Sequence, residues 1–249
     1  MEATMVGLRR NEKHEYWWNA TGPLPSVTKI IGTIDKSGPL VGWAKRVTAE
    51  AALAHRDELA GWVKDFGLDG AVSMLTKAAT AKRESAADMG TRVHALADSL
   101  ARGLETVVTE EERPFVEAYM AYLREKEPRF LYSEDMVCSL KHGYAGTFDA
   151  IVVIGGETWM IDNKTAKGTY PETALQLAAY ANADFIGRPN LRTQGRIPRI
   201  DRYGVLHLRP EGYRLVEYKV TPDTFDAFLD ALRLTAWRDG EAQTVMEKK

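Results

Sequence analysis

The sequence predicts an α/β protein in which helices flank a central mixed sheet, with a helical region before that sheet. Between residues 26 and 126, apolar residues recur every three or four positions, as they do on the buried face of a helix. From Phe130 onward, short runs rich in β-branched and aromatic residues, bounded by Gly or Pro, are typical of strands. Helical patterns between and after these runs predict the order helices, three strands, helix, two strands, helix.

The helices of the first half are expected at residues 26–34, 41–66, 70–103 and 111–127. The later elements are expected, in order, as strands at 130–140, 144–154 and 157–165, a helix at 171–185, strands at 202–210 and 212–220, and a helix at 222–237. No internal repeat or low-complexity linker divides the chain. We therefore expect a helical N-terminal wall over residues 1–85 and a sheet-containing core over residues 86–249.

Composition excludes several classes of protein. The chain has 249 residues, 45% of them hydrophobic, which is enough for a sizeable core, and its net charge is −2. No apolar run reaches the roughly 18 residues of a membrane span, and the N-terminus is too polar for a secretory signal, so we expect a cytoplasmic protein without a membrane partner. The single cysteine, Cys138, can form neither an internal disulfide nor a cysteine-bound metal cluster. Any metal must therefore be held by oxygen and imidazole.

One expected hairpin carries two carboxylates on strands that look buried on both faces. If its Gly-Gly dipeptide forms a two-residue turn, the register places Asp149 opposite Asp162. Like charges that face each other destabilise a strand pair, so we expect a cation between them and expect Asp149→Asn to melt higher than the wild type in chelator. Lys164 leaves the same face as Asp162. Oxygen ligands without thiolates select Mg²⁺ or Mn²⁺.

These residues resemble the motifs of the PD-(D/E)XK nuclease superfamily, in particular its RecB-like and phage-type exonuclease branch. The matching residues are Asp149 in G-T-x-D, Asp162-Asn163-Lys164 as the D-x-K triplet, Gln176 and Tyr180 in Q-x-x-x-Y, and His94 in an upstream G-T-x-x-H. The segment that begins at Pro25 also resembles the opening of phage-type members, so the resemblance extends from there to the last helix. It implies a restriction-endonuclease-like core.

The resemblance also implies roles for the site residues. A Mg²⁺ or Mn²⁺ ion would be held by His94, Asp149, Asp162 and the Asn163 carbonyl. Lys164 would position or deprotonate the attacking water and stabilise the anionic transition state. Relatives with an iron–sulfur cluster use four cysteines, so the single cysteine of this chain predicts that no such cluster is present.

Four further residues are candidates for supporting roles. Asp98, one helical turn after His94, is predicted to hydrogen-bond the second imidazole nitrogen. Glu134 is expected to add a carboxylate behind the ligands or for a second metal, provided that the strand register turns it inward. Gln176 and Tyr180 either hold Lys164 or a substrate phosphate, or else Tyr180 packs on the sheet while Gln176 is solvated.

A basic segment lies between residues 188 and 202, where five arginines and one aspartate give a local net charge of +4. This bias predicts contacts with DNA phosphates, although an ordinary solvated loop explains it equally well. The candidate DNA-binding residues are Arg188, Arg192, Arg196 and Arg199. We interpret the aromatic residues in the first part of the chain as packing residues rather than base-stacking ones: Tyr16, Trp17, Trp18 and Trp43.

Together these features predict a metal-dependent DNA exonuclease that hydrolyses phosphodiester bonds in phage recombination, replication or repair. The expected partners are DNA and a recombination protein such as a single-strand annealing protein, in the cytoplasm of a bacterial host. Three alternatives remain: a structure-specific endonuclease with the same site, a DNA-binding or scaffolding protein of the same fold that does not cleave, and a nuclease subunit that needs a partner for processivity. We find no sequence motif for another nucleophile or for a helicase motor.

Overall fold

The computed structural model describes residues 7–34, 37–187 and 194–245. The chain forms two compact units, of which one contains Met1–Ile34 with Val93–Lys249 and the other contains Asp35–Arg92. The described strands all belong to the first, which is called the sheet unit below, and the second is the helical unit. By this division the core begins at residue 93, not at residue 86 as the sequence suggested, and the described residues 7–34 belong to the same unit.

The helical unit contains α2 (Ser37–Ala54) and most of α3 (Leu59–Ala101). One residue of α3, Gly67, leaves helical geometry with φ 71° and ψ 173°. Glycine adopts this positive φ without the steric cost that a side chain would bring. The kink falls in the gap between the helices expected at 41–66 and 70–103, which confirms that break. The end of α3, from Val93, belongs to the sheet unit.

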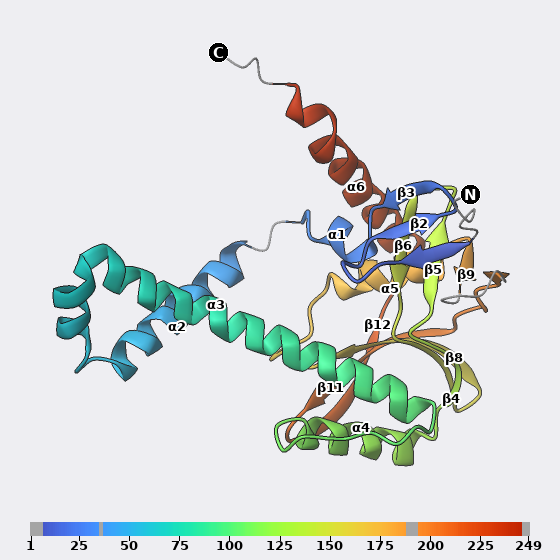
Figure 1. Ribbon diagram of the computed structural model, residues 1–249. Helices are drawn as coiled ribbons and strands as arrows, with labels where there is room; N and C mark the ends of the chain where they lie inside the picture. Colours follow the sequence, from blue (N-terminus) through green and yellow to red (C-terminus); the bar gives the residue numbers. More distant parts are fainter. Residues whose placement is uncertain (1–6, 35–36, 188–193, 246–249) are drawn as a thin grey trace, which may run out of the picture. The chain divides into compact units, whose positions relative to one another are not determined.

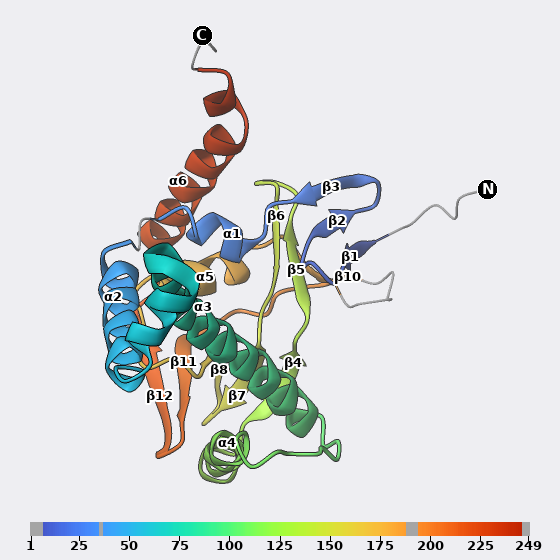
Figure 2. The same ribbon diagram turned by 60° about the vertical axis from the view of Figure 1, so that its left-hand side comes forward.

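Five strands form the main sheet of the sheet unit, in the order β12-β11-β8-β7-β4. Neighbouring strands are antiparallel except β8 and β11, which are parallel. The strands are β4 (Arg129–Ser133), β7 (Ala150–Ile154), β8 (Glu157–Lys164), β11 (Arg202–Arg209) and β12 (Gly212–Tyr218). Helices α4 (Arg113–Lys126) and α5 (Thr173–Ala181) lie on opposite faces of it (Figures 1 and 2). The predicted mixed sheet flanked by helices is confirmed.

The β7–β8 hairpin has the register expected from its Gly-Gly turn. Both turn glycines have positive φ, 59° and 88°, as a primed turn requires. The paired residues run from Ile154–Glu157 to Ala150–Ile161. In this register Asp149 would face Asp162 next, but β7 begins at Ala150, so Asp149 lies just beyond the end of the ladder.

Two smaller sheets complete the sheet unit. The first has the order β10-β9-β5-β6 and consists of β5 (Met136–Ser139), β6 (Tyr144–Thr147), β9 (Phe185–Gly187) and β10 (Gln194–Gly195). The second consists of β1 (Leu8–Arg10), β2 (Tyr16–Trp18) and β3 (Thr21–Leu24). The two pack together through the apolar side chains of Leu8, Tyr16, Met136, Cys138, Ala145 and Phe185.

The prediction of a helical wall over residues 1–85 is thus wrong for residues 8–24, which form three short strands and their connections. The cause is tertiary packing, because Tyr16 is only 3% exposed and the rings of Trp18 and Phe185 lie 4.9 Å apart. Trp17 packs under the guanidinium of Arg9. The interpretation as packing residues is confirmed for Tyr16, Trp17 and Trp18, whereas Trp43 is exposed.

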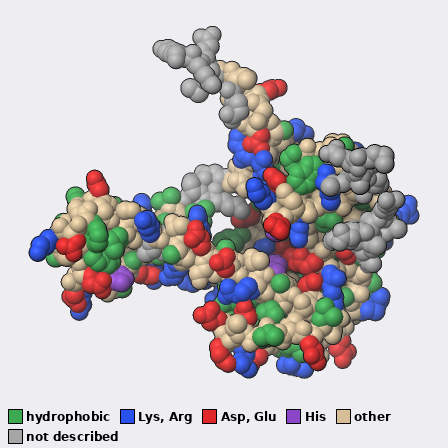
Figure 3. All heavy atoms as spheres, viewed as in Figure 1, with side chains coloured by type: hydrophobic (Ala, Val, Ile, Leu, Met, Phe, Trp, Pro, Cys, Tyr) green, Lys and Arg blue, Asp and Glu red, His purple; other side chains and the backbone are tan. Residues whose placement is uncertain are grey.

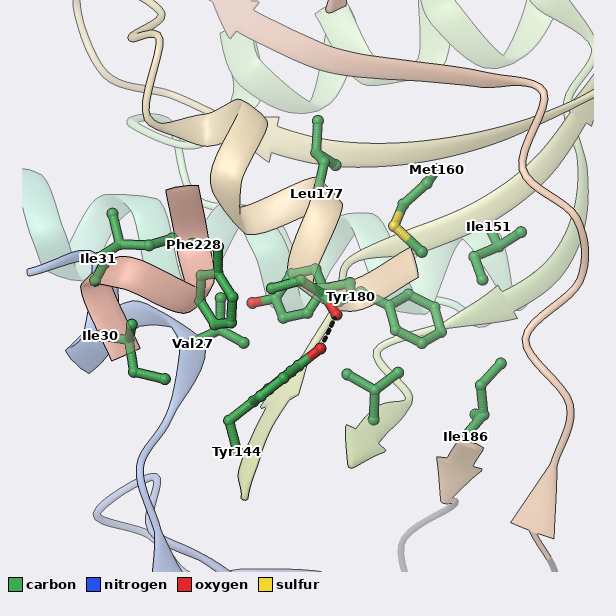
Figure 4. Packing of buried hydrophobic residues seen from close by; sticks show 14 residues of the cluster. Val27, Ile30, Ile31, Tyr144, Ile151, Met160, Leu177, Tyr180, Ile186 and Phe228 are labelled. Carbon is green, nitrogen blue, oxygen red and sulfur yellow. Dashed lines mark hydrogen bonds between the residues drawn. The ribbon is translucent and has the colours of Figure 1, made fainter. Parts of the chain in front are cut away.

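The main core lies where α1 (Val27–Ile31), α5 and α6 (Pro222–Asp239) meet the sheets (Figure 4). Tyr144 and Phe228 are fully buried in it, and the Tyr144 hydroxyl donates to the Ala179 carbonyl at 2.8 Å. This bond ties β6 to α5 and so fixes the helix that carries Gln176 and Tyr180. A short 3₁₀ helix, Glu241–Gln243, follows α6. Within the described ranges, no helix is both long and apolar enough to cross a membrane.

Candidate active site

Two of the expected strands are broken in the middle, and the breaks lie side by side. The run 130–140 divides into β4 and β5 at Glu134 and Asp135, and the run 144–154 divides into β6 and β7 at Phe148 and Asp149. At each break the chain passes between the five-stranded and the four-stranded sheet. The Glu134 N–H donates to the Asp149 carbonyl at 3.0 Å across this corner. The corner therefore brings two carboxylates together.

His94, near the end of α3, faces the corner. Its Nδ1 lies 3.3 Å from Asp149 Oδ1 and 4.0 Å from Glu134 Oε1. The three side chains each offer one ligand atom, and these atoms all lie within 4.8 Å of one another. Asp149 Oδ2 accepts a hydrogen bond from the Asn163 N–H, which holds the carboxylate against β8. Figure 3 shows a histidine and several acidic side chains gathered on this face of the sheet unit.

These groups set one another's charge. The Asp149 carboxylate raises the pKa of His94 to about 9, although burial opposes the shift. Burial, with the Asp149 charge, raises the pKa of Glu134 to about 8. Burial also acts to raise the pKa of Asp149, but His94, Lys164 and the Asn163 N–H together hold it below its usual value. At neutral pH the metal-free cluster thus holds an ionised Asp149 beside a protonated His94.

Asp162, near the end of β8, is 2% exposed and has partners of its own. Lys164 Nζ lies 2.7 Å from its Oδ2, and Gln176 Nε2 donates to its Oδ1 at 2.8 Å. Burial raises the pKa of Asp162 to about 6, and the Lys164 ammonium limits this rise. Burial acts to lower the pKa of Lys164, but Asp162 and Asp149 keep it above its usual value. The expected cation is therefore present, and it pairs with Asp162.

Tyr180 packs in the core, as one of the two alternatives expected, while Gln176 is bound to a site residue, which matches neither alternative as stated. Tyr180 is 2% exposed in the core, and its hydroxyl accepts a hydrogen bond from Gln176 Nε2 at 3.2 Å. Gln176 is bound to Asp162 rather than solvated, and it does not hold Lys164 directly. A Cβ at Gly146 would lie 2.6 Å from the Tyr180 ring, so the glycine of G-T-x-D lets α5 approach β6. The glycine of the G-T-x-D motif is therefore needed to make room for the tyrosine of the Q-x-x-x-Y motif.

Two other candidates differ from expectation. Asp98 accepts hydrogen bonds from Arg102 Nε at 2.8 Å and Ser133 Oγ at 2.6 Å, and no described contact joins it to His94. It braces α3 against β4 instead. Glu134 does not lie on a strand, because it occupies the corner with a left-handed φ of 52°. The question of which strand face it occupies therefore does not arise.

The basic segment is described only in part. Arg188 and Arg192 lie outside the described residues. Arg196 and Arg199 are exposed, and Arg199 lies 3.5 Å from Asp201. Among the described residues, neither arginine contacts the carboxylates of the candidate site. Their role in binding DNA remains a prediction.

The donor set of His94, Glu134 and Asp149 fits a divalent cation. It offers one imidazole nitrogen and two carboxylate oxygens, and such oxygen-rich sets without thiolate suit Mn²⁺ or Mg²⁺. Asp162 lies outside this group, since Lys164 and Gln176 already bind its oxygens. Asn163 contributes its N–H to Asp149. Glu134 thus stands in the group where the sequence suggested Asp162.

Sequence reasoning placed Glu134 near the site but misjudged its position. The signal was the pair of adjacent acidic residues Glu134-Asp135 in an otherwise apolar run, which interrupts the alternation of a strand. A similar interruption occurs at Asp149. Two such interruptions in neighbouring runs indicate a shared corner.

Gln176→Ala is expected to destabilise the protein by about 1–3 kcal/mol, because it removes a donor to the buried Asp162 carboxylate. Tyr180→Phe is the matched control, since it removes only the hydroxyl that accepts from Gln176 and leaves the Asp162 bond in place. Urea unfolding in chelator measures both. Equal loss of stability in the two variants would contradict a special role for the Gln176–Asp162 bond.

No profile of a known protein family matches the chain, and no curated protein matches it in sequence.

Proposed function

We propose that the protein is a metal-dependent deoxyribonuclease of the PD-(D/E)XK type that degrades DNA from an end. The observation that supports this most strongly is the meeting of four side chains that come from three separate sequence motifs: His94, Asp149, Asp162 and Lys164. A mixed sheet flanked by helices is compatible with a restriction-endonuclease-like core. The motif resemblance and the geometry favour the same chemistry.

The residues divide into two groups with different tasks. A divalent cation held by His94, Glu134 and Asp149 would neutralise charge on the phosphodiester and lower the pKa of a bound water. Lys164 is placed to orient the attacking water and to stabilise the negative charge of the transition state. Asp162 holds the Lys164 ammonium, and Gln176 in turn holds Asp162.

A non-cleaving DNA-binding or scaffolding protein of the same fold is less consistent with this arrangement. A buried carboxylate such as Asp162, which is 2% exposed, costs stability even when it is paired. A protein that only binds DNA has no need of such a pair beside a metal-binding group. An endonuclease with the same site accounts for these residues equally well, and the choice of substrate separates the two.

The test is digestion of three DNA substrates with Mg²⁺, Mn²⁺ or chelator: end-labelled linear duplex, end-labelled single strand and closed circle. We expect metal-dependent loss of linear DNA from an end, while the closed circle remains intact. Because contaminating nucleases also need metal, Asp149→Asn protein prepared in parallel serves as the control.

The other outcomes decide between the alternatives. Rapid cutting of the closed circle would overturn end-dependence and favour an endonuclease. Binding of DNA without cleavage under every condition would favour the non-cleaving class. RNA cleaved in preference to DNA would contradict the proposed substrate.

A further inference from the structure

The N-terminal sheet brings one arginine to the edge of the candidate active site. Arg10, the last residue of β1, donates from Nη1 to Thr147 Oγ1 at 3.0 Å. The Tyr16 hydroxyl lies 2.9 Å from the same oxygen. Thr147 is the last residue of β6 and lies two residues before Asp149. The guanidinium is therefore tied to the strand that leads into the site.

Arg10 is not neutralised by the acidic groups of the site. Asp149 pairs with His94 and Asp162 pairs with Lys164. The charge of Arg10 acts to lower the pKa of Glu134, yet within the described residues no ion pair joins the two side chains.

The rest of the Arg10 side chain is open to solvent. Its exposed guanidinium has five N–H donors, and Thr147 is the single described residue that accepts a hydrogen bond from it. Most of the fork is thus available to a ligand with several acceptor oxygens.

Anchoring the N-terminal sheet does not by itself require this side chain. A hydrogen bond to the neutral hydroxyl of Thr147 needs one N–H donor and no charge, so glutamine could also make it. A guanidinium adds a positive charge and a planar fork, which match a phosphate group. The contact with Thr147 therefore does not by itself explain why this residue is an arginine.

We propose that Arg10 contacts a backbone phosphate of the DNA strand bound at this site, so that the N-terminal sheet forms part of the substrate-binding surface. This inference rests on the proposed function and adds a substrate contact to it. Thr147 and Tyr16 act as positioning residues, because the Thr147 hydroxyl binds the guanidinium and the Tyr16 hydroxyl binds that of Thr147. The phosphate bound by Arg10 would lie next to the metal-binding group.

The test measures binding of a fluorescent linear duplex over a range of salt concentrations, with Ca²⁺ in place of Mg²⁺ and with the products checked for cleavage. The proteins compared are the wild type, Arg10→Gln, Arg10→Lys and Arg233→Gln. Arg233 is the matched control, because it is an exposed arginine on α6 that pairs with Asp230. Thermal melting of each protein verifies the fold.

Arg10→Gln is expected to reduce the slope of log K against log salt by about 0.9, the value for one lost phosphate contact. Its affinity at moderate salt should fall by about tenfold, as for loss of one charge-assisted hydrogen bond. Arg10→Lys should keep the slope while binding more weakly than the wild type, because it keeps the charge and loses the fork. Arg233→Gln should behave as the wild type.

Each other result has a distinct meaning. If the wild type binds DNA and Arg10→Gln has the same slope and affinity, the role of Arg10 is overturned while the proposed function stands. If Arg233→Gln weakens binding as much as Arg10→Gln, the effect reflects overall charge and the contact is again overturned. If the wild type does not bind DNA at all, the proposed function and this inference both fail.

Discussion

Lys164→Ala is expected to slow DNA cleavage by about 10²–10⁴-fold, the range for loss of a group that serves proton transfer or the transition-state charge. Mn²⁺ binding should survive, because the proposed cation-binding group consists of His94, Glu134 and Asp149 and does not include the ammonium. Single-turnover digestion of end-labelled duplex measures the rate, and calorimetric titration measures Mn²⁺ binding. Together they separate a role in chemistry from a role in holding the metal.

Lys167→Ala is the matched control for this variant. Lys167 is an exposed lysine three residues further along the chain, and its loss removes the same charge without touching Asp162. It should cleave DNA at the wild-type rate. Since Lys164→Ala leaves the buried Asp162 without its cation, that carboxyl should take up a proton, and the melting temperature has to be compared as well. Loss of Mn²⁺ binding in Lys164→Ala, with the fold intact, would contradict the assigned role.

Asp149→Asn is expected to abolish cleavage and the stabilisation of the protein by Mn²⁺. A ligand stabilises only the folded state that binds it, so the melting temperature of the variant should rise little when the ion is added. Asp226→Asn is the control, because Asp226 is an exposed aspartate on α6. Melting curves with and without Mn²⁺ check the prediction, and a full Mn²⁺ response in Asp149→Asn would remove this carboxylate from the metal-binding group.

In chelator, Asp149→Asn is expected to melt at a lower temperature than the wild type. The sequence alone suggested the opposite, a higher melting temperature. The facing carboxylates indicated a repulsion that Asn would relieve. In the structure Asp149 lies 3.3 Å from His94, and its pKa is lowered, so the fold favours its charge. Losing that pair should cost about 1–3 kcal/mol. For a chain of this length, each kcal/mol corresponds to roughly 2–4 °C.

This difference in chelator should depend on pH in one direction. The folded pKa of His94 is raised to about 9 by Asp149. A raised folded pKa stabilises the fold below the unfolded pKa of His, roughly 6.5, and the contribution is lost as the pH rises through the folded value. The wild type should therefore exceed Asp149→Asn most at pH 6 to 7 and least above about pH 9. A gap that widens towards high pH would contradict the His94–Asp149 pair.

Much of the sheet and of the site could be predicted because local signals determine it. The Gly-Gly turn sets the β7–β8 register, since a two-residue loop permits one pairing, and the pairs from Ile154–Glu157 to Ala150–Ile161 follow. The alternation of the strand then places Lys164 on the same face as Asp162. Both relations, the hairpin register and the shared face of Asp162 and Lys164, involve residues close in sequence, and both are found in the structure.

The N-terminal strands could not be predicted in the same way. β1 and β2 have three residues each, too few for a period of two to be distinguished from a helical pattern. They are stabilised by packing on another sheet, where Tyr16 and Leu8 are buried against β5, β6 and β9. Because this packing joins segments more than a hundred residues apart in sequence, Arg10 could not be placed beside Thr147 from the sequence.

The sequence by itself identified the four side chains to which the proposed chemistry is assigned, namely His94, Asp149, Asp162 and Lys164, and it determined the hairpin that positions the last three. Only the tertiary structure decided how they are divided, with Asp149 joined to His94 and Glu134, and Asp162 joined to Lys164 and Gln176. The physical reason is the corner at which two strand runs change sheets. Its geometry depends on a bond between the Glu134 N–H and the Asp149 carbonyl, which belong to different strand runs and meet only when both sheets have formed.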